Sequence, residues 1–182
     1  MAWEFDVLYW FQELHQPVLD KIVVAVTTLG NSGIFWIILT VLMLIFCKDK
    51  KPAWTSAVAL ILSLLVCNIL LKNTVARERP CWIDPSVEML VKVPRDYSFP
   101  SGHSSASFAS AVSVFLYYRK PGIAALILAG CIALSRLYLF VHFPTDVLAG
   151  TLLGILEAVA AYYIVKYISG IRKKGHPEVN AK

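Results

Sequence analysis

An all-α integral membrane helical bundle is the fold class that this sequence predicts, and composition and length are the main reasons. Of the 182 residues, 58% are hydrophobic and only 16% are charged, whereas about 25% of an ordinary soluble domain is charged. The mean hydropathy of +0.65 agrees with this. Because a transmembrane helix needs about 20 apolar residues, about five full spans use roughly 100 residues and leave short loops. A large soluble domain, a repeat array and a disordered chain are excluded.

Residues 1–33 are predicted to be an amphipathic region that includes interfacial helices. Apolar and polar side chains mix along this region, which is too polar at its start to cross a bilayer. Segment 18–29 is apolar but only about half a span long, so the sequence leaves open whether it crosses. A turn is indicated at 30–33, where the sequence reads Gly-Asn-Ser-Gly. Three aromatic residues suit the lipid–water interface: Trp3, Tyr9 and Trp10.

Residues 34–167 are predicted to form the transmembrane core of a single domain. This core contains five apolar stretches, each closed by charged or turn-forming residues. Between the second and third stretches, residues 72–100 are too charged to lie in lipid, and residues 168–182 form a basic tail. The predicted spans are 34–47, 53–71, 102–118, 123–141 and 145–167.

The distribution of lysine and arginine predicts the orientation of these spans. One end of the predicted bundle carries ten of the 17 basic residues, including Lys48, Arg119 and the tail. The other end carries seven, three of which belong to motifs that need positive charge for chemistry, together with most of the acidic residues. Cytoplasmic loops hold the excess of basic residues. The sequence therefore predicts a multi-pass plasma membrane protein with a cytoplasmic C-terminus and an extracytoplasmic 72–100 loop.

The basic character of the chain does not predict a nucleic-acid partner. The net charge is +5, but the basic residues lie at the ends of apolar runs rather than on one polar helix or arm. The four cysteines have no metal-ligand spacing, and neither clustered carboxylates nor a His-x-x-x-His pair is present. We expect no metal and no other cofactor.

Three polar clusters interrupt the apolar pattern, and alternating spans bring all three to the same membrane surface. The first runs from Lys72 to Pro80, the second from Pro100 to His103, and the third from Ser135 to Asp146. Taken singly, they have ordinary explanations, namely snorkelling charges, a helix N-cap and a structural hydrogen-bonded pair. Three unrelated features are not expected to converge on one face, and ionisable residues at membrane depth are costly.

The residue types in these clusters suit phosphoryl transfer. Lysine and arginine side chains match the oxygens of a phosphate, and Gly102 permits close backbone approach beside a helix N-terminus, where free N–H groups face an anion. Of two histidines, one can attack phosphorus while the other protonates the leaving oxygen. Asp146 lies four residues beyond His142 and can accept the proton of its other ring nitrogen. Pro144 suits the first position of a helix.

The patterns K-x6-R-P, P-S-G-H and S-R-x5-H-x3-D, in this order within residues 72–146, resemble the three signature motifs of the type-2 phosphatidic acid phosphatase superfamily. This resemblance implies that His142 is the nucleophile that forms a phosphohistidine, that Asp146 orients it and that His103 is the general acid. Arg77 lies at a free position of the first motif and is taken as auxiliary. The phosphate-binding residues that the resemblance implies are Lys72, Arg79, Ser101, Gly102 and Arg136.

Small members of this family with few extra loops resemble bacterial undecaprenyl-diphosphate phosphatases. The resemblance therefore implies metal-independent hydrolysis of undecaprenyl diphosphate to undecaprenyl phosphate and phosphate on the outer face of the plasma membrane, with a lipid phosphate in the bilayer as partner. Alternatives are a phosphatase of another lipid, such as phosphatidylglycerol phosphate, phosphatidic acid or a lipid A phosphate, and a non-catalytic lipid-phosphate transporter. A transporter has no need for two poised histidines and an aspartate.

Four further features each have a structural and a functional interpretation. Glu157 in the fifth span is either a packing residue or part of a lipid entrance. Gly150 and Gly154 form a G-x-x-x-G pattern that serves packing within the chain rather than dimerisation. Asn68 either holds Lys72 or makes an interhelical hydrogen bond. Loop 81–99 is either an interfacial cover or a gate for the headgroup.

Overall fold

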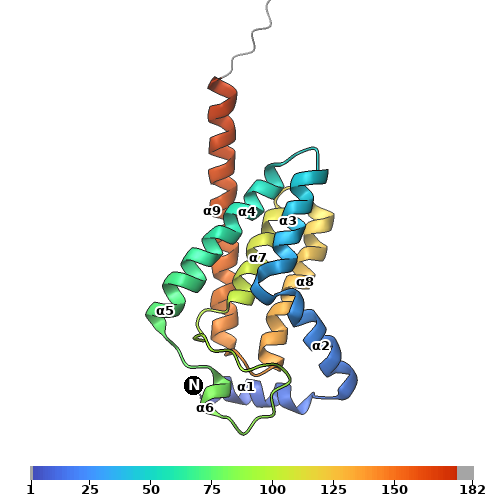
Figure 1. Cartoon of the computed structure of the whole chain (residues 1–182), viewed down its shortest axis with the longest axis vertical. Helices are drawn as coiled ribbons and strands as arrows, with labels where there is room; N and C mark the ends of the chain where they lie inside the picture. Colours follow the sequence, from blue (N-terminus) through green and yellow to red (C-terminus); the bar gives the residue numbers. More distant parts are fainter. Residues whose placement is uncertain (1, 176–182) are drawn as a thin grey trace, which may run out of the picture.

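The computed structural model describes residues 2–175, with side chains up to residue 171, as helices joined by turns and one long loop (Figure 1). No strand occurs among these residues, so the all-α prediction is confirmed. Residues 176–182 of the predicted tail lie outside the described part, whereas 168–175 continue the last helix. In chain order the elements are α1 (Ala2–Glu13), α2 (Pro17–Leu29), the 3-10 turn η1 (Asn31–Gly33), α3 (Ile34–Phe46), α4 (Lys51–Leu62), the π-helical η2 (Ser63–Leu71), α5 (Lys72–Val75), α6 (Pro80–Ile83), α7 (Gly102–Phe115), α8 (Arg119–Tyr138) and α9 (Pro144–Gly175).

Within the described residues, three helical stretches are long and apolar enough to cross a bilayer: Lys51–Ile83, Arg119–Tyr138 and Pro144–Ile171. Helices α2 and α3 qualify together as a fourth span, broken by a bend of 46° at the 30–33 turn. Segment 18–29 is therefore one arm of this bent pair, which has the length and composition of either a broken span or a re-entrant loop. The predicted third span is the exception, because α7 has 14 residues and is shorter than a full crossing. By length and composition alone, the described helices thus account for up to four spans rather than five.

Helix α7 is short and rich in serine because it lies inside the bundle and not against lipid. Its side chains are mostly buried, and it packs between α4, α8 and α9. Its serines form hydrogen bonds to the neighbouring helices, as polar side chains between membrane helices do. These bonds join Ser107 to Trp36 (2.9 Å), Ser110 to Ser56 (2.8 Å) and Ser105 to Ser63 (2.6 Å). A hydrophobic-span criterion therefore describes α7 poorly, although it is the central helix of the bundle.

The G-x-x-x-G pattern brings α9 against α7. A Cβ atom at residue 150 would lie 2.4 Å from the carbonyl oxygen of Ser101, and one at residue 154 would lie 2.3 Å from that of Ser105. Only glycine permits this approach, so the prediction of packing within the chain is confirmed. The same contact places the start of α7 beside the start of α9, where the Ser101 N–H donates to the carbonyl oxygen of Asp146 (3.0 Å).

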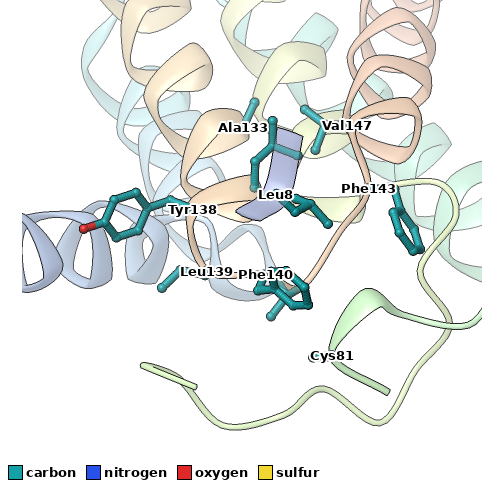
Figure 2. Packing of buried hydrophobic residues seen from close by; sticks show 10 residues of the cluster. Leu8, Cys81, Ala133, Tyr138, Leu139, Phe140, Phe143 and Val147 are labelled. Atoms are coloured by element: carbon teal, nitrogen blue, oxygen red, sulfur yellow. The ribbon is translucent and has the colours of Figure 1, made fainter. Parts of the chain in front are cut away.

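Helix α1 lies across the end of the bundle at which α8 passes into α9 (Figure 1). Leu8 is fully buried there, among Ala133, Tyr138, Phe140 and Val147 (Figure 2). Three aromatic residues of α1 are about half exposed: Trp3 (55%), Tyr9 (42%) and Trp10 (54%). One side of α1 therefore packs on the protein, while exposed aromatic side chains suit a lipid–water interface.

Candidate active site

A cavity of about 1000 Å³ unites most of the predicted site. The first polar cluster runs from α5 to the start of α6, the second lies at the start of α7, and the third runs from the end of α8 to the start of α9. All three meet at the end of the bundle that carries α1. Both histidines belong to the same wall. The predicted residues that line the cavity are Lys72, Arg79, Gly102, His103, Arg136 and His142. Ser101 and Asp146, the other two predicted residues, lie behind this wall.

His142 lies in the turn between α8 and α9 and is buried. Its Nε2 is 3.1 Å from Nη1 of Arg79. Burial, together with the positive charges of Arg79, Arg136 and Lys72, holds the pKa of His142 well below its usual 6.5. A lowered pKa means that the imidazole is neutral at neutral pH, which is the form that a nucleophile needs.

Asp146 does not accept a hydrogen bond directly from His142, contrary to the expected contact. Its Oδ2 lies 3.7 Å from Nδ1 of His142, because this oxygen already accepts from the Phe143 N–H (2.8 Å) and from the Ser98 hydroxyl (2.5 Å). Ser98 Oγ is also 3.4 Å from His142 Nδ1, so it lies between the two groups. The predicted helix start at Pro144 is confirmed, and it sets Asp146 over the first turn of α9.

Ser98 was not predicted, and the sequence offers little sign of it. It is buried within the long loop between α6 and α7, 44 positions from His142 and 48 from Asp146. The one available signal is its place three residues before Ser101, where the chain returns to the motif that starts α7.

The cations Lys72 and Arg79 share one carboxylate, that of Asp96. Lys72 Nζ lies 2.5 Å from Asp96 Oδ2, and Arg79 Nη2 lies 2.9 Å from Asp96 Oδ1. Arg79 also donates to the carbonyl oxygen of Val141 (2.6 Å), so backbone as well as charge fixes its guanidinium. Partial burial opposes ionisation of Asp96, but the Lys72 hydrogen bond and the positive charges of both cations prevail and lower its pKa to about 2. Protonation at ordinary pH therefore does not release this clamp.

Asp96→Asn is expected to strengthen competitive inhibition by inorganic phosphate. The carboxylate occupies two cations that an incoming phosphate needs, and each partly exposed ion pair contributes about 0.2–1 kcal/mol. Loss of both ion pairs predicts that the inhibition constant for inorganic phosphate falls roughly two- to thirtyfold. The matched control is Glu88→Gln, which removes one charge from an exposed residue of the same loop outside the cavity wall. A rise in the constant for Asp96→Asn would instead show that Asp96 orients the cations for phosphate.

Arg136 presents an incompletely satisfied guanidinium to the cavity. It is buried, its Nη1 donates to the Thr27 hydroxyl at 2.5 Å, and its Nε has no hydrogen-bond partner. A buried, unpaired N–H of a cation is costly unless an acceptor binds there. This arrangement fits an anion at the cavity wall.

Ser101 and Gly102 start α7 in the way their sequence indicates. Ser101 Oγ accepts from the Ser104 N–H (3.4 Å) and the Ser104 hydroxyl (3.0 Å), so Ser101 is the N-cap. Gly102 lies against Asn68, whose Oδ1 would be 2.5 Å from a Cβ atom at residue 102. Asn68 donates weakly to the Ser63 carbonyl oxygen (3.4 Å). The partner of Lys72 is Asp96, so the idea that Asn68 holds Lys72 is wrong.

The break between α2 and α3 receives His103. Its Nε2 is 3.0 Å from Oδ1 of Asn31 in the turn. A Cβ atom at residue 30 would lie 2.6 Å from Cδ2 of His103, so glycine is needed for the close approach. The sequence indicated residues 30–33 only as a turn between two helices. In the structure this turn helps to position the imidazole of His103.

The cavity continues from this polar end into an apolar groove between α3 and α4. The side chains of Ile37, Val41, Ile61 and Leu64 line it, and each is about half exposed, between 46% and 56%. Residues 91–96 line the cavity, so this part of loop 81–99 forms one side of the site. Glu157 does not line the cavity; Ser105 donates to its Oε2 (2.9 Å), which supports the packing interpretation.

Arg77 lies outside the cavity wall, as its assignment as auxiliary requires. Its guanidinium points instead to Glu4 and Asp146. Among the residues that the structure describes, no three histidine, cysteine, aspartate or glutamate side chains form a group that could hold a metal ion.

Fold and cavity together define a multi-pass helical membrane protein whose cavity is lined at one end by three cationic side chains and two imidazoles. The family model of the PAP2 superfamily matches residues 52–169. The chain belongs to this superfamily, as its three motifs predicted.

Curated relatives carry several different names. The "Bacitracin transport permease protein BcrC" of Bacillus licheniformis is 37% identical over 89 residues, which cover 49% of this chain and 44% of the relative. The "Undecaprenyl-diphosphatase" of Sulfolobus acidocaldarius is 33% identical over 138 residues, covering 75% and 66%. The "Phosphatidylglycerophosphatase B" of Bacillus subtilis is 32% identical over 166 residues, covering 84% and 76%. The chain thus spans about half to two thirds of the first two relatives.

A solved structure has the same fold. Aquifex aeolicus LpxE superposes with a TM-score of 0.76 at 25% sequence identity, and the match covers 87% of this chain and 94% of that one. The all-α membrane fold is therefore shared along nearly the whole of both chains.

Proposed function

We propose that this protein is a metal-independent membrane phosphatase that hydrolyses undecaprenyl diphosphate to undecaprenyl phosphate and phosphate. One observation carries the proposal: a single cavity combines two imidazoles and three cationic side chains at its polar end with an apolar groove at the other. Cationic donors suit a phosphate, and the groove suits a hydrocarbon chain. The cations are Lys72, Arg79 and Arg136, and the imidazoles are those of His103 and His142.

The geometry supports in-line transfer to His142. Its Nε2 faces the cavity beside Arg79, 3.1 Å from a guanidinium nitrogen that can bind an equatorial phosphate oxygen. As the P–N bond forms, the P–O bond to undecaprenyl phosphate breaks, and His103 gives the leaving oxygen a proton. Ser98 and Asp146 stabilise the positive charge that develops on the imidazole of His142. Water then attacks phosphorus, His103 takes its proton, and the P–N bond breaks to release phosphate.

The groove between α3 and α4 supports sideways entry of the lipid. Because its lining side chains are half exposed on the outside of the bundle, a prenyl chain in the bilayer can lie between the two helices while the diphosphate reaches the cations. This arrangement favours a lipid phosphate over a soluble one. The Sulfolobus relative named undecaprenyl-diphosphatase supports the diphosphate as substrate.

The decisive experiment measures phosphate release by the purified protein in detergent from four substrates: undecaprenyl diphosphate, phosphatidic acid, phosphatidylglycerol phosphate and a lipid A phosphate. We expect the highest kcat/KM for undecaprenyl diphosphate, with activity retained in excess chelator. A higher value for phosphatidylglycerol phosphate would assign the chain to the activity named for its Bacillus subtilis relative. Absence of phosphate release from all four substrates would favour a transporter. In detergent no gradient exists to drive transport, whereas a phosphatase still hydrolyses its substrate.

We also propose that the site faces the extracytoplasmic side and the C-terminus the cytoplasm. The α3–α4 and α7–α8 turns carry the lysines and Arg119 and lie at the end of the bundle opposite α1 (Figure 1). The test uses a background in which all four cysteines are replaced by alanine. An impermeant maleimide should label Ser86→Cys in intact cells and Lys120→Cys only after permeabilisation. The reverse pattern would invert the orientation.

A further inference from the structure

The carboxylate of Asp146 has a partner that neither the motifs nor the cavity assign. Its Oδ2 faces Ser98 and His142, but its Oδ1 accepts a hydrogen bond from Nη1 of Arg77 (2.6 Å). Arg77 therefore holds the oxygen that points away from the histidine. A carboxylate that accepts hydrogen bonds through both oxygens cannot rotate about its Cβ–Cγ bond without breaking one of these hydrogen bonds.

Arg77 is itself fixed by the first turn of α1. Its Nη2 donates to Oε2 of Glu4 (2.8 Å), and its Nη1 also contacts the hydroxyl of Thr145 (2.7 Å). Thr145 in turn donates to Oε1 of Glu4 (2.6 Å). The guanidinium packs over the ring of Phe143, 4.1 Å from its centroid. These contacts form a closed set in which both oxygens of Glu4 are used.

This set does not bind the phosphate. Neither Arg77 nor Glu4 lines the cavity, and Glu4 is almost completely buried, with 4% of its surface exposed. Two carboxylates already pair with the guanidinium of Arg77, whereas Arg136 lines the cavity and forms no ion pair with a described carboxylate. A buried charge that is fully paired is suited to fixing geometry and not to binding an exchanging ligand.

We propose that Arg77 and Glu4 are positioning residues for Asp146 and that α1 is thereby part of the catalytic apparatus. The inference rests on the proposed phosphatase function. Arg77 sets the rotation of the Asp146 carboxylate, which orients His142 through Ser98, and Glu4 keeps the Arg77 guanidinium in place. Small misplacements of reacting groups cost up to about 100-fold in rate. We therefore expect disturbance of Arg77 or Glu4 to lower kcat and to leave substrate affinity nearly unchanged.

The test compares Glu4→Gln and Arg77→Lys with Gln12→Ala, using phosphate release from undecaprenyl diphosphate in detergent. Gln12 lies on the same helix and donates to the carbonyl oxygen of Tyr138 (3.0 Å), away from the Arg77 cluster. Gln12→Ala therefore weakens docking of α1 without touching Asp146. We expect kcat per folded molecule to fall about 10- to 100-fold in Glu4→Gln and Arg77→Lys, with KM within about twofold of wild type. Gln12→Ala should keep its kcat.

A double-mutant cycle makes the interpretation specific. In an Arg77→Lys background, Glu4→Gln should lower kcat by much less than it does alone, because both act through one guanidinium. A purely structural role would lower Tm in all three single variants and leave kcat per folded molecule unchanged, and that result would overturn the proposal. Equal loss of kcat in Gln12→Ala would also overturn it. Absence of phosphate release from the wild type would instead refute the proposed function itself.

Discussion

Replacing His142 with alanine is expected to abolish phosphate release from undecaprenyl diphosphate while leaving the fold intact. The imidazole lies in the cavity wall with its Nε2 3.1 Å from Nη1 of Arg79, and loss of a nucleophile typically costs about 10,000-fold or more. The variant should also fail to form an acid-labile phosphoenzyme when incubated with labelled substrate. Quench-flow measurement of the labelled protein checks this directly.

The matched control for this prediction is His15→Ala. His15 lies at the end of α1, stacks on Tyr138 with a centroid separation of 4.3 Å and is outside the cavity wall. The His15→Ala variant therefore reports the cost of removing an imidazole that takes no part in the reaction, and it should retain nearly full activity. Full activity of purified His142→Ala would refute the assignment of the nucleophile, whatever the other motif residues do.

His103→Ala is expected to show a defect that depends on the leaving group. The alkoxide released from a lipid monophosphate such as phosphatidic acid is a poor leaving group without a proton, so turnover of that lipid should fall by about 100- to 10,000-fold. An aryl phosphate such as p-nitrophenyl phosphate needs no proton to leave, so the first step should survive in this variant. The second step also lacks its base, and a phosphoenzyme should therefore accumulate as a burst of p-nitrophenol.

Asn31→Ala separates the role of His103 from that of its surroundings. It removes the group 3.0 Å from Nε2 of His103 but keeps the imidazole, so the loss should be smaller than in His103→Ala. Equal slowing of His103→Ala with lipid and aryl substrates, without a burst, would show that His103 binds phosphate and does not transfer a proton.

The local sequence predicted those parts of the site that depend on neighbouring residues. Pro144 starts α9 and Ser101 caps α7 because each motif contains its own helix start signal. Convergence of the three clusters followed from the alternation of spans, which needs only their order along the chain. Six of the predicted residues consequently line one cavity.

The parts of the site that the sequence did not predict depend on the path of the loop between α6 and α7 and on the bend between α2 and α3. Asp96 and Ser98 act through contacts with residues 17 to 48 positions away, and no periodicity constrains a loop to follow a particular path. The 46° break between α2 and α3 was indicated only as a turn, although it places Asn31 beside His103. The length and hydropathy criterion does not identify α7 as a span, because a helix inside a membrane bundle need not be apolar throughout.

The contact of Glu4 with Thr145 spans 141 positions, and this separation sets the order in which the molecule can be completed during synthesis. Helix α1 leaves the ribosome well before Thr145, which emerges only when α9 begins. Until then, Oε1 of Glu4 lacks the Thr145 hydroxyl as its hydrogen-bond donor. Nascent chains that stop before residue 145 therefore lack the contact that joins α1 to the start of α9.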